Sequence, residues 1–434
     1  MNINNLIQRW STLSISQIED EIVDGENQEE VTQLIGADKV AEIRATSFAA
    51  PMAGPREGVV LLPGIMGSLL ASIRGVATLV WINPLVFLQG NGRYLRLDPD
   101  GTSDECAEVE IVPIGLEKLT YLQIAVQIRR QAILHEFPYD WRRPIEYNAD
   151  VLHASLERWS EGDPSRKFTL VAHSMGGLVS RTYMARHPKS AEQRVKRLIM
   201  HGTPNFGATG AIDNLFNGNA MMATVDLLNN ANGMRQLAFC LPSVYQLLPA
   251  PRDFFPTDRP YPVSFDHFNA AAWGLPAIQQ KYLDGARSLY QALNASDPQI
   301  PMVVISGCNI KTLVGAILNL VNGRIQFQPS LEDEGDNSGD GTVPLWSARL
   351  PRAETFFIQE VHRDLPNNGQ VIQATLDLIN DGTCKLPQTI PPRKLISFAE
   401  EIPVSPEVKA EELRAKIKAG ILNDRDLRSL FTLS

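Results

Sequence analysis

The sequence Phe168-Thr-Leu-Val-Ala-His-Ser-Met-Gly-Gly177 is an apolar run that leads directly into a turn of the pattern small-x-Ser-x-Gly. In a nucleophile elbow, a buried parallel strand turns sharply into a helix and presents a serine at the apex of the turn. The residues beside that serine are small because strand and helix almost touch there, and Ala172 stands where the usual motif has glycine. The run therefore predicts a strand, a tight turn and a helix, with the hydroxyl of Ser174 held clear of the sheet.

Further short apolar runs lie on both sides of this one, and helical patterns separate them. Uninterrupted apolar runs are typical of strands that are buried on both faces, as in a parallel sheet. Alternation of such strands with helices, joined by right-handed crossovers, predicts an α/β fold with a doubly wound, mostly parallel sheet. The expected strands are 58–63, 168–172, 197–200, 302–306 and 354–358, and the clearest helices are 117–134, 148–159 and 178–187.

Two long segments do not fit this alternation. Residues 71–115 include the apolar, aromatic run Leu79–Leu88, and residues 205–298 separate two expected strands by far more than an ordinary connection. Insertions between core elements commonly form caps over an active site. We therefore expect a catalytic domain that carries both insertions as caps or lids. Its expected range is 51–395, with a helical extension over 1–50 before it and a helical segment over 400–434 after it.

The composition is that of a soluble globular protein, with 44% apolar and 21% charged residues in a chain of 434. A net charge of −9 argues against nucleic-acid binding, which needs a basic face. The four cysteines lie far apart without metal-ligand spacing, so we expect free thiols and no metal site. The N-terminus has no apolar stretch of signal-peptide length, and no window is apolar for long enough to predict a transmembrane helix. These features predict a cytoplasmic protein.

A serine hydroxyl needs a base within hydrogen-bonding distance to act as a nucleophile at neutral pH. In chains with a nucleophile elbow, an acid and then a histidine follow the serine. Beyond residue 267 the only histidine is His362, which follows the strand expected at 354–358. His173 is adjacent to Ser174, so its side chain must point elsewhere, and we expect it to pack structurally. The predicted base is therefore His362.

The acid of such a triad should lie after a late strand and before the histidine. Asp340, in Asn337-Ser-Gly-Asp-Gly-Thr-Val-Pro344, meets this condition, and its two flanking glycines let the loop turn tightly enough to aim the carboxylate inward. It would hold the imidazole in one tautomer and stabilise the imidazolium. Asp336 and Asp333, from the same loop, remain alternatives.

An oxyanion hole requires two backbone N–H donors that point at the developing negative charge. One should come from Met175, the residue after the predicted nucleophile. The other should come from the loop Leu62-Pro-Gly-Ile-Met-Gly-Ser68, where two glycines allow the backbone to approach a substrate. Ile65 is the expected donor there, and Met66 is the alternative.

Taken in order along the chain, several of these segments resemble the lecithin:cholesterol acyltransferase-like α/β-hydrolases, which include lysosomal phospholipase A2 and phospholipid:diacylglycerol acyltransferases. The resemblance covers about residues 56–366. The segments that carry it are Pro63–Leu70, Phe137–Pro144, Val171–Gly177, Gly202–Gly207 and Gly339–Pro344.

The resemblance implies an α/β-hydrolase fold and a Ser174–Asp340–His362 triad, with an oxyanion hole at Ile65 and Met175. It also implies an insertion that touches a membrane around Trp81 and Phe87, and a mobile lid within about 205–250. Tyr139-Asp-Trp-Arg142 is expected to be a structural turn that the aspartate and the arginine hold together. The family chemistry requires neither a metal nor an organic cofactor.

Members of this family take an acyl chain from a phospholipid and pass it to water or to an alcohol. We therefore expect a serine-dependent acyl-ester hydrolase or acyltransferase that acts on phospholipids at a membrane surface through an acyl-enzyme. One alternative is a soluble carboxylesterase or thioesterase with the same triad. Another is a non-catalytic, hydrolase-like binding scaffold. The terminal segments lie outside the resemblance and are the candidates for binding a protein partner.

Overall fold

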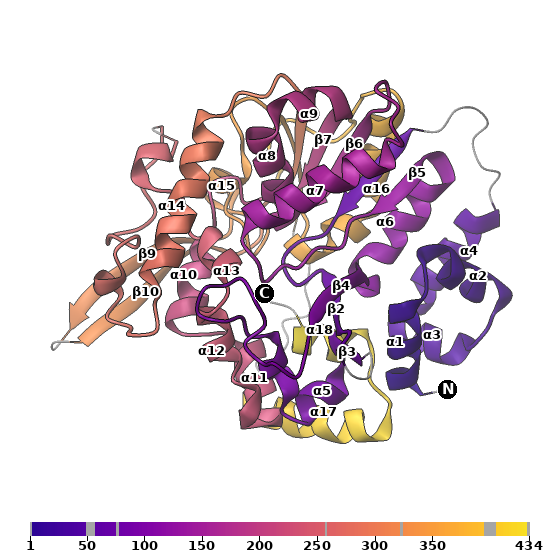
Figure 1. The fold of residues 1–434 in the computed structure, drawn as a ribbon, viewed down its shortest axis with the longest axis horizontal. Coiled ribbons are helices and arrows are strands. Elements are labelled where there is room, and N and C mark those ends of the chain that lie inside the picture. Colours follow the sequence, from indigo (N-terminus) through magenta and orange to yellow (C-terminus); the bar gives the residue numbers. More distant parts are fainter. Residues whose placement is uncertain are drawn as a thin grey trace.

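The strand before the elbow is β6 (Phe168–His173) in the computed structural model, which describes residues 2–48, 57–74, 78–256, 258–321, 324–394 and 405–431 (Figure 1). It lies in a six-stranded sheet with β1 (Gly58–Leu62), β5 (Ile133–Glu136), β7 (Val195–His201), β8 (Met302–Gly307) and β11 (Glu354–Ile358). The strand order is β11-β8-β7-β6-β1-β5, and all neighbours are parallel. Every residue of β6 and β8 is buried, as expected for strands covered on both faces.

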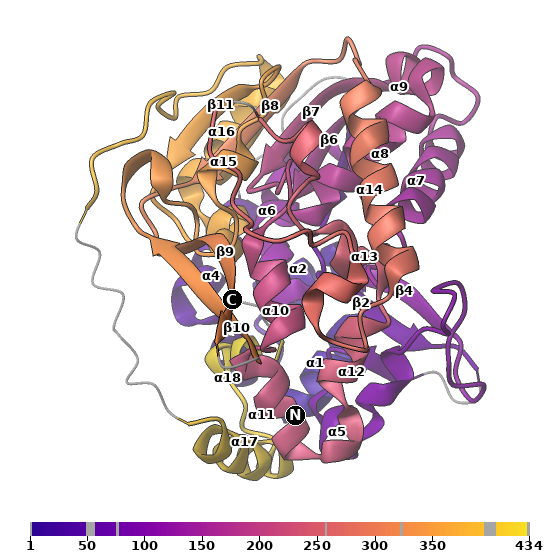
Figure 2. The ribbon, with the colours of Figure 1, turned by 90° about the vertical axis from the view of Figure 1, so that its left-hand side faces the viewer.

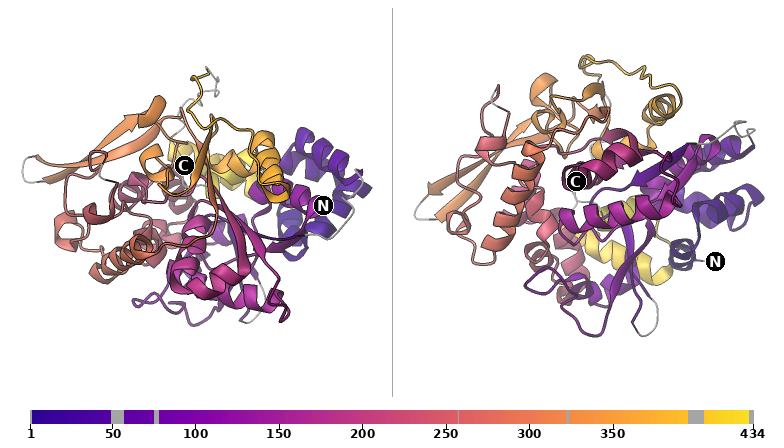
Figure 3. Two further views of the ribbon diagram at one scale, coloured as in Figure 1. Left: turned by 90° about the horizontal axis from the view of Figure 1, so that it is seen from above. Right: turned by 45° about the horizontal axis from the view of Figure 1, so that its top comes forward.

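Two layers of helices cover this sheet, and Figure 3 shows them on its opposite sides. The first layer contains α7 (Ile145–Trp159), α8 (Met175–Arg186) and α14 (Gln280–Ala295), which pack against one another through α8. The second contains α6 (Lys118–Gln131) and α16 (Gly369–Asn380), which are also in contact. The predicted doubly wound, mostly parallel sheet of an α/β-hydrolase is confirmed.

The first insertion forms a small sheet of its own beside the main one. Its antiparallel strands are β2 (Ser68–Ser72), β3 (Thr78–Trp81) and β4 (Ile111–Leu116), in the order β3-β2-β4. The short helix α5 (Pro84–Leu88) follows β3. The second insertion is mostly helical and contains α10 (Thr209–Phe216), α11 (Ala220–Leu228), α12 (Met234–Phe239), α13 (Pro242–Gln246) and then α14.

A two-stranded antiparallel ribbon projects from one side of the molecule in Figure 1, and Figure 2 views the molecule from that side. It consists of β9 (Thr312–Val321) and β10 (Arg324–Glu332), and α10 packs against it. The ribbon is not among the expected strands. Asn322-Gly323, a dipeptide typical of hairpin turns, is the signal in the sequence that points to it.

Helices from the N-terminal and C-terminal ends of the chain contact each other. The four N-terminal helices are α1 (Ile3–Thr12), α2 (Ile15–Asp24), α3 (Gln28–Ile35) and α4 (Ala37–Phe48), and α2 and α4 contact α6. At the other end, α17 (Pro406–Ala419) packs along α11 and α5, and α18 (Asp424–Phe431) contacts α11 and α3. The amide of Ile3 donates to the carbonyl of Gly420, which follows α17.

The expected domain boundaries near residues 50 and 395–400 lie outside the described residues, so they stay predictions. Across the described ranges, none of the helices combines the length and apolar character that crossing a bilayer requires.

Candidate active site

Ser174 lies at the junction between β6 and α8, and its backbone conformation is strained. Its φ of 53° and ψ of −125° fall in a region that residues with a Cβ atom rarely adopt. Its amide donates to the carbonyl of His201 at the end of β7, which anchors the turn to the sheet. A Cβ atom at Gly176 would lie 2.5 Å from the Pro63 carbonyl, and one at Gly177 would lie 2.0 Å from Thr203 Oγ1. The small residues after the serine are therefore a steric requirement.

The structure brings Ser174, His362 and Asp340 together in one chain of contacts. Ser174 Oγ lies 2.9 Å from His362 Nε2, and His362 Nδ1 lies 2.7 Å from Asp340 Oδ2. His362 follows β11 and opens the short 3₁₀ helix His362–Asn367. With Nδ1–H donated to the carboxylate, Nε2 carries a lone pair directed at the serine hydroxyl. This is the geometry a general base requires.

Asp340 is fixed in place by backbone groups as well as by the imidazole. Its Oδ1 accepts hydrogen bonds from the amides of Thr342 and Val343, and its own carbonyl accepts from the amide of His362. The two alternative acids point elsewhere, because Asp336 pairs with Arg349 and Asp333 pairs with Arg393 at the surface.

Gly202, directly after β7, allows the histidine and the acid to approach each other. Its φ is +55°, and a Cβ atom there would lie 2.9 Å from His362 Nδ1 and 3.0 Å from Asp340 Oδ2. The first glycine of the Gly202–Gly207 segment therefore leaves room for the imidazole–carboxylate contact.

The loop after β1 lies against the serine. A Cβ atom at Gly64 would lie 2.9 Å from Ser174 Cβ, and Met66 has a φ of +63°. Within the described residues, the amides of Ile65, Met66 and Met175 donate to no protein acceptor. All three N–H groups are thus available to an anionic oxygen. The choice between Ile65 and Met66 as the second donor stays a prediction.

His173 takes part in a hydrogen-bonded chain that the sequence does not reveal. The Gly64 amide donates to the Tyr121 hydroxyl over 2.8 Å, and this hydroxyl lies 2.8 Å from His173 Nδ1. On the other side of the ring, His173 Nε2 lies 3.1 Å from the carbonyl oxygen of His362. Burial, with a smaller contribution from His362, holds the pKa of His173 well below 6.5. A neutral ring that accepts at Nδ1 and donates at Nε2 satisfies every group in this chain.

Trp81 and Phe87 do not face a membrane in this structure, so that expectation is wrong. Both side chains are 0% exposed. The Trp81 indole packs edge-on against Phe87 and Trp141, and its Nε1 donates to the Met66 carbonyl. The apolar run that contains them supports the loop beside the serine from within.

The predicted structural turn at residues 139–142 is confirmed. Arg142 is fully buried and donates to both carboxylate oxygens of Asp140, over 2.9 Å from Nε and 2.8 Å from Nη2. Its Nη1 also reaches Asp104, which lies in the first insertion. The turn therefore ties that insertion to the core beside the site.

Comparisons with known proteins match this chain in sequence and in structure. Residues 118–328 match the family model of lecithin:cholesterol acyltransferase. Among curated relatives from Arabidopsis thaliana, lecithin-cholesterol acyltransferase-like 4 is 25% identical over 236 residues, which cover 44% of this chain and 43% of the relative. Phospholipase A(1) LCAT3 is 28% identical over 160 residues, which cover 36% of this chain and 35% of that relative. The matches therefore span less than half of either relative.

Solved structures resemble the chain at much lower identity. A chain of the Tle4–Tli4 complex is 14% identical, with a TM-score of 0.49, over 74% of this chain and 97% of that one. The mature Bacillus licheniformis lipase BlEst2 is also 14% identical, with a TM-score of 0.40, over 76% of this chain and 95% of the lipase chain.

Proposed function

We propose that this chain, which resembles the lecithin:cholesterol acyltransferase family in sequence and has an α/β-hydrolase fold, is a serine-dependent lipid acyl hydrolase or acyltransferase. Its substrates would be phospholipid esters at a membrane surface. The single observation that carries the proposal is the chain of contacts from Ser174 Oγ through His362 to Asp340, 2.9 Å and 2.7 Å long. Relatives named as an acyltransferase-like protein and as a phospholipase support the class of substrate.

In the first half of the reaction, Ser174 Oγ attacks the ester carbonyl carbon while His362 Nε2 accepts the hydroxyl proton. Asp340 stabilises the imidazolium that results, without accepting the proton itself. The negative charge moves to the former carbonyl oxygen. The amide of Met175 and that of Ile65 or Met66 donate hydrogen bonds to this oxygen.

The tetrahedral intermediate then collapses, and the bond from the acyl carbon to the lysolipid oxygen breaks. His362 gives its proton to the departing oxygen, which leaves the acyl group on Ser174. In the second half, His362 accepts a proton from water or from an alcohol as that molecule attacks the acyl-enzyme. The bond from the acyl carbon to Ser174 Oγ then breaks, and His362 returns the proton to Oγ. Water yields a free fatty acid, and an alcohol yields a new ester.

Membrane contact, in this proposal, belongs to the expected insertion but not to the side chains of Trp81 and Phe87. The exposed apolar side chain closest in sequence to this buried pair is that of Leu85 on α5, which contacts α11 and α17 at one end of the molecule (Figure 1). Four exposed apolar side chains lie there: Leu85 on α5, Leu227 on α11, Val408 on α17 and Ile421, two residues beyond the end of α17. Arg414 on α17 donates to the Leu227 carbonyl, which joins two of the helices.

The test of the chemistry is mass spectrometry of mixed phospholipid vesicles that contain diacylglycerol and sterol, incubated with wild type or Ser174→Ala. We expect lysophospholipid only with wild type. An equal amount of free fatty acid would identify a phospholipase, and newly acylated alcohol would identify an acyltransferase. Product formation by a folded Ser174→Ala variant would overturn the proposed role of the serine.

The test of the membrane surface is a matched pair of charge substitutions. Leu85 on α5 and Val151 on α7 are each 37% exposed, so Leu85→Glu and Val151→Glu add the same charge at equally accessible positions. We expect Leu85→Glu to lower vesicle binding and vesicle hydrolysis, with the rate on a short soluble ester unchanged. Equal behaviour of the two variants would count against this surface.

The burial of Trp81 and Phe87 favours a second candidate, a soluble carboxylesterase or thioesterase with the same triad. It predicts equal rates on monomeric short-chain esters and on vesicles. A rate that rises sharply once the ester aggregates would exclude it.

A further inference from the structure

Arg181, two turns into the helix that begins after Ser174, has no acidic partner within the described residues. Its Nη1 donates to the backbone carbonyl and to the side-chain oxygen of Asn205, 3.1 Å and 3.0 Å away. Its Nε and Nη2 donate to no group in the described part of the chain. Burial lowers the pKa of Arg181 to about 10. The Arg181 side chain is partly exposed. A partly buried guanidinium without a counterion still carries a desolvation cost, and its unused N–H groups remain available to a partner.

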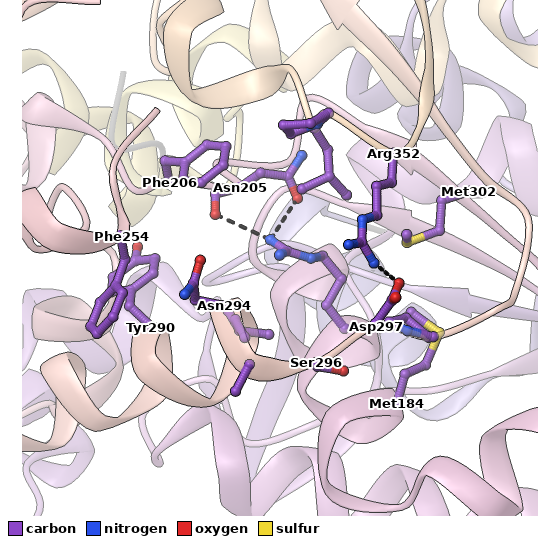
Figure 4. Close-up of a pocket in the computed structure, with 16 residues that line it drawn as sticks. Met184, Asn205, Phe206, Phe254, Tyr290, Asn294, Ser296, Asp297, Met302 and Arg352 are labelled. Carbon is purple, nitrogen blue, oxygen red and sulfur yellow. Dashed lines mark hydrogen bonds and ion pairs between the residues drawn. The ribbon is translucent and has the colours of Figure 1, made fainter. Parts of the chain in front are cut away.

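Arg181 lines a cavity of about 320 Å³ between α8, α14 and the segment before β11. The cavity walls are mixed, and Figure 4 shows Phe206, Phe254 and Tyr290 on one side and Met184 and Met302 on the other. Small-molecule sites typically combine such an apolar lining with a few polar groups that fix the ligand's orientation. None of the lining residues is Ser174, Asp340 or His362, so the cavity is separate from the candidate triad.

The other charges in the cavity cancel each other. Arg352 and Asp297 form an ion pair at its rim, and both side chains are more than half exposed (Figure 4). Arg181 is therefore the source of the net positive charge. Asn205 holds this charge in place, because its Nδ2 donates to the Ala348 carbonyl while its two oxygens accept from Arg181.

The Nε and Nη2 edge of an arginine matches the two oxygens of a carboxylate or phosphate, which it binds through parallel hydrogen bonds. We propose that this cavity is a binding site for an amphiphilic anion, with its charged group on the free edge of Arg181 and its alkyl body against the apolar walls. A fatty acid and a phosphate-bearing lipid share this chemistry. Binding there does not depend on catalysis by Ser174.

Calorimetric titration of the full-length Ser174→Ala protein tests the proposal without turnover of the ligand. The probes are decanoate, decyl phosphate and decan-1-ol, which share an alkyl chain and differ in the head group. We expect one or both anions to bind at least about tenfold more tightly than the alcohol, since a hydrogen bond to a charged group is commonly worth that much. Tighter binding of decanoate identifies a fatty-acid site, and tighter binding of decyl phosphate identifies a phospholipid-type ligand. Equal binding of all three probes would overturn the proposal.

Two substitutions in the same background assign the binding to this cavity. Arg181→Gln should weaken anion binding at least about tenfold. Arg352→Gln, which removes an arginine that is already paired, should change it less than about twofold. Anion binding that survives Arg181→Gln lies elsewhere and overturns the assignment.

A third substitution covers the case in which Arg181→Gln fails to fold. Asn294 lines the cavity and is exposed, and its side chain makes no hydrogen bond within the described residues. Asn294→Trp leaves Arg181 intact and should occupy part of the cavity. We expect weaker anion binding by a folded protein, and unchanged affinity would equally overturn the proposal.

Discussion

The hydroxyl of Tyr121 lies 2.8 Å from His173 Nδ1, although the two residues are 52 positions apart in the chain. Through this contact, the loop that carries the candidate oxyanion donors is connected to the backbone of the candidate base. Gly64 is at one end of the chain of hydrogen bonds and the carbonyl of His362 is at the other. The relative position of these two groups therefore depends on one phenol and one neutral imidazole.

Tyr121→Phe tests this connection. The change leaves the Gly64 amide and His173 Nδ1 without their shared partner, so the two loops should lose their fixed alignment. We expect kcat to fall about tenfold or more with KM on vesicles nearly unchanged, because alignment matters most in the transition state. Tyr183→Phe is the matched control, since Tyr183 is also buried and bonds through its hydroxyl to Ser190, away from the site. Equal losses in both variants would indicate a general packing effect.

Ser174 should contribute to activity and not to stability. We expect Ser174→Ala to lower kcat by about 10⁴-fold or more. Glycine tolerates the strained backbone conformation of this residue better than alanine does. The free energy of unfolding of Ser174→Gly should therefore be about 1 kcal/mol higher than that of Ser174→Ala. Urea denaturation of the two variants measures the difference. A more stable Ser174→Ala would contradict the account of strain at the elbow.

Gly202→Ala should damage the site by separating the histidine from the acid. Its new Cβ atom would lie 2.9 Å from His362 Nδ1, so we expect the rate of labelling by a serine-directed phosphonate to fall at least about tenfold. Gly210→Ala is the control, because nothing lies within 4 Å of the position of its added Cβ atom. Wild-type labelling of a folded Gly202→Ala protein would show that the imidazole position tolerates this intrusion.

Three buried histidines make the stability of the protein depend on pH. Burial lowers the pKa values of His201 and His267 to about 4 each, and that of His173 well below 6.5. Well above pH 6.5 these rings are neutral in both the native and the unfolded state, so they do not affect the free energy of unfolding. As the pH falls below 6.5, the unfolded chain binds protons that the native protein does not. The free energy of unfolding should therefore fall by about 2 kcal/mol at pH 5 for each of His201 and His267, and His173 should lower it further.

His267→Gln tests the assignment of this pH dependence. A glutamine keeps a donor for the Pro249 carbonyl, to which His267 Nε2 donates, and does not titrate. Denaturation series at pH 7 and pH 5 should show a smaller loss of stability in the variant than in wild type. Identical losses would mean that His267 is protonated in the native protein at pH 5.

The parallel sheet and its elbow could be predicted because local sequence determines them. The apolar runs mark strands that are buried on both faces, and small residues follow Ser174 because Pro63 and Thr203 leave no room for larger ones. His362 and Asp340 could be proposed from chain order alone. The contacts of His362 with Ser174 and with Asp340 agree with that order, and the catalytic roles of these residues stay predictions.

The remainder depended on contacts between distant parts of the chain. Trp81 and Phe87 are apolar whether they face a lipid or a protein interior, and their burial is decided by Trp141 and the Met66 carbonyl. The roles of Tyr121 and Arg181 are equally hidden. The role of Tyr121 depends on a hydrogen bond to a distant histidine. The role of Arg181 depends on its having no carboxylate partner in the part of the chain that the structure describes.

The projecting ribbon has a consequence for how copies of this protein meet. Among the described strands, β10 pairs only with β9. The backbone N–H and C=O groups on its outer edge can therefore pair with a strand of another molecule. Pro329 lies opposite Ala316, whose own amide and carbonyl bond away from β10, so the outer row of donors is interrupted at the proline. Pro329→Val would restore the donor and should increase aggregation in light-scattering measurements. A single imino acid thus works against edge-to-edge polymerisation.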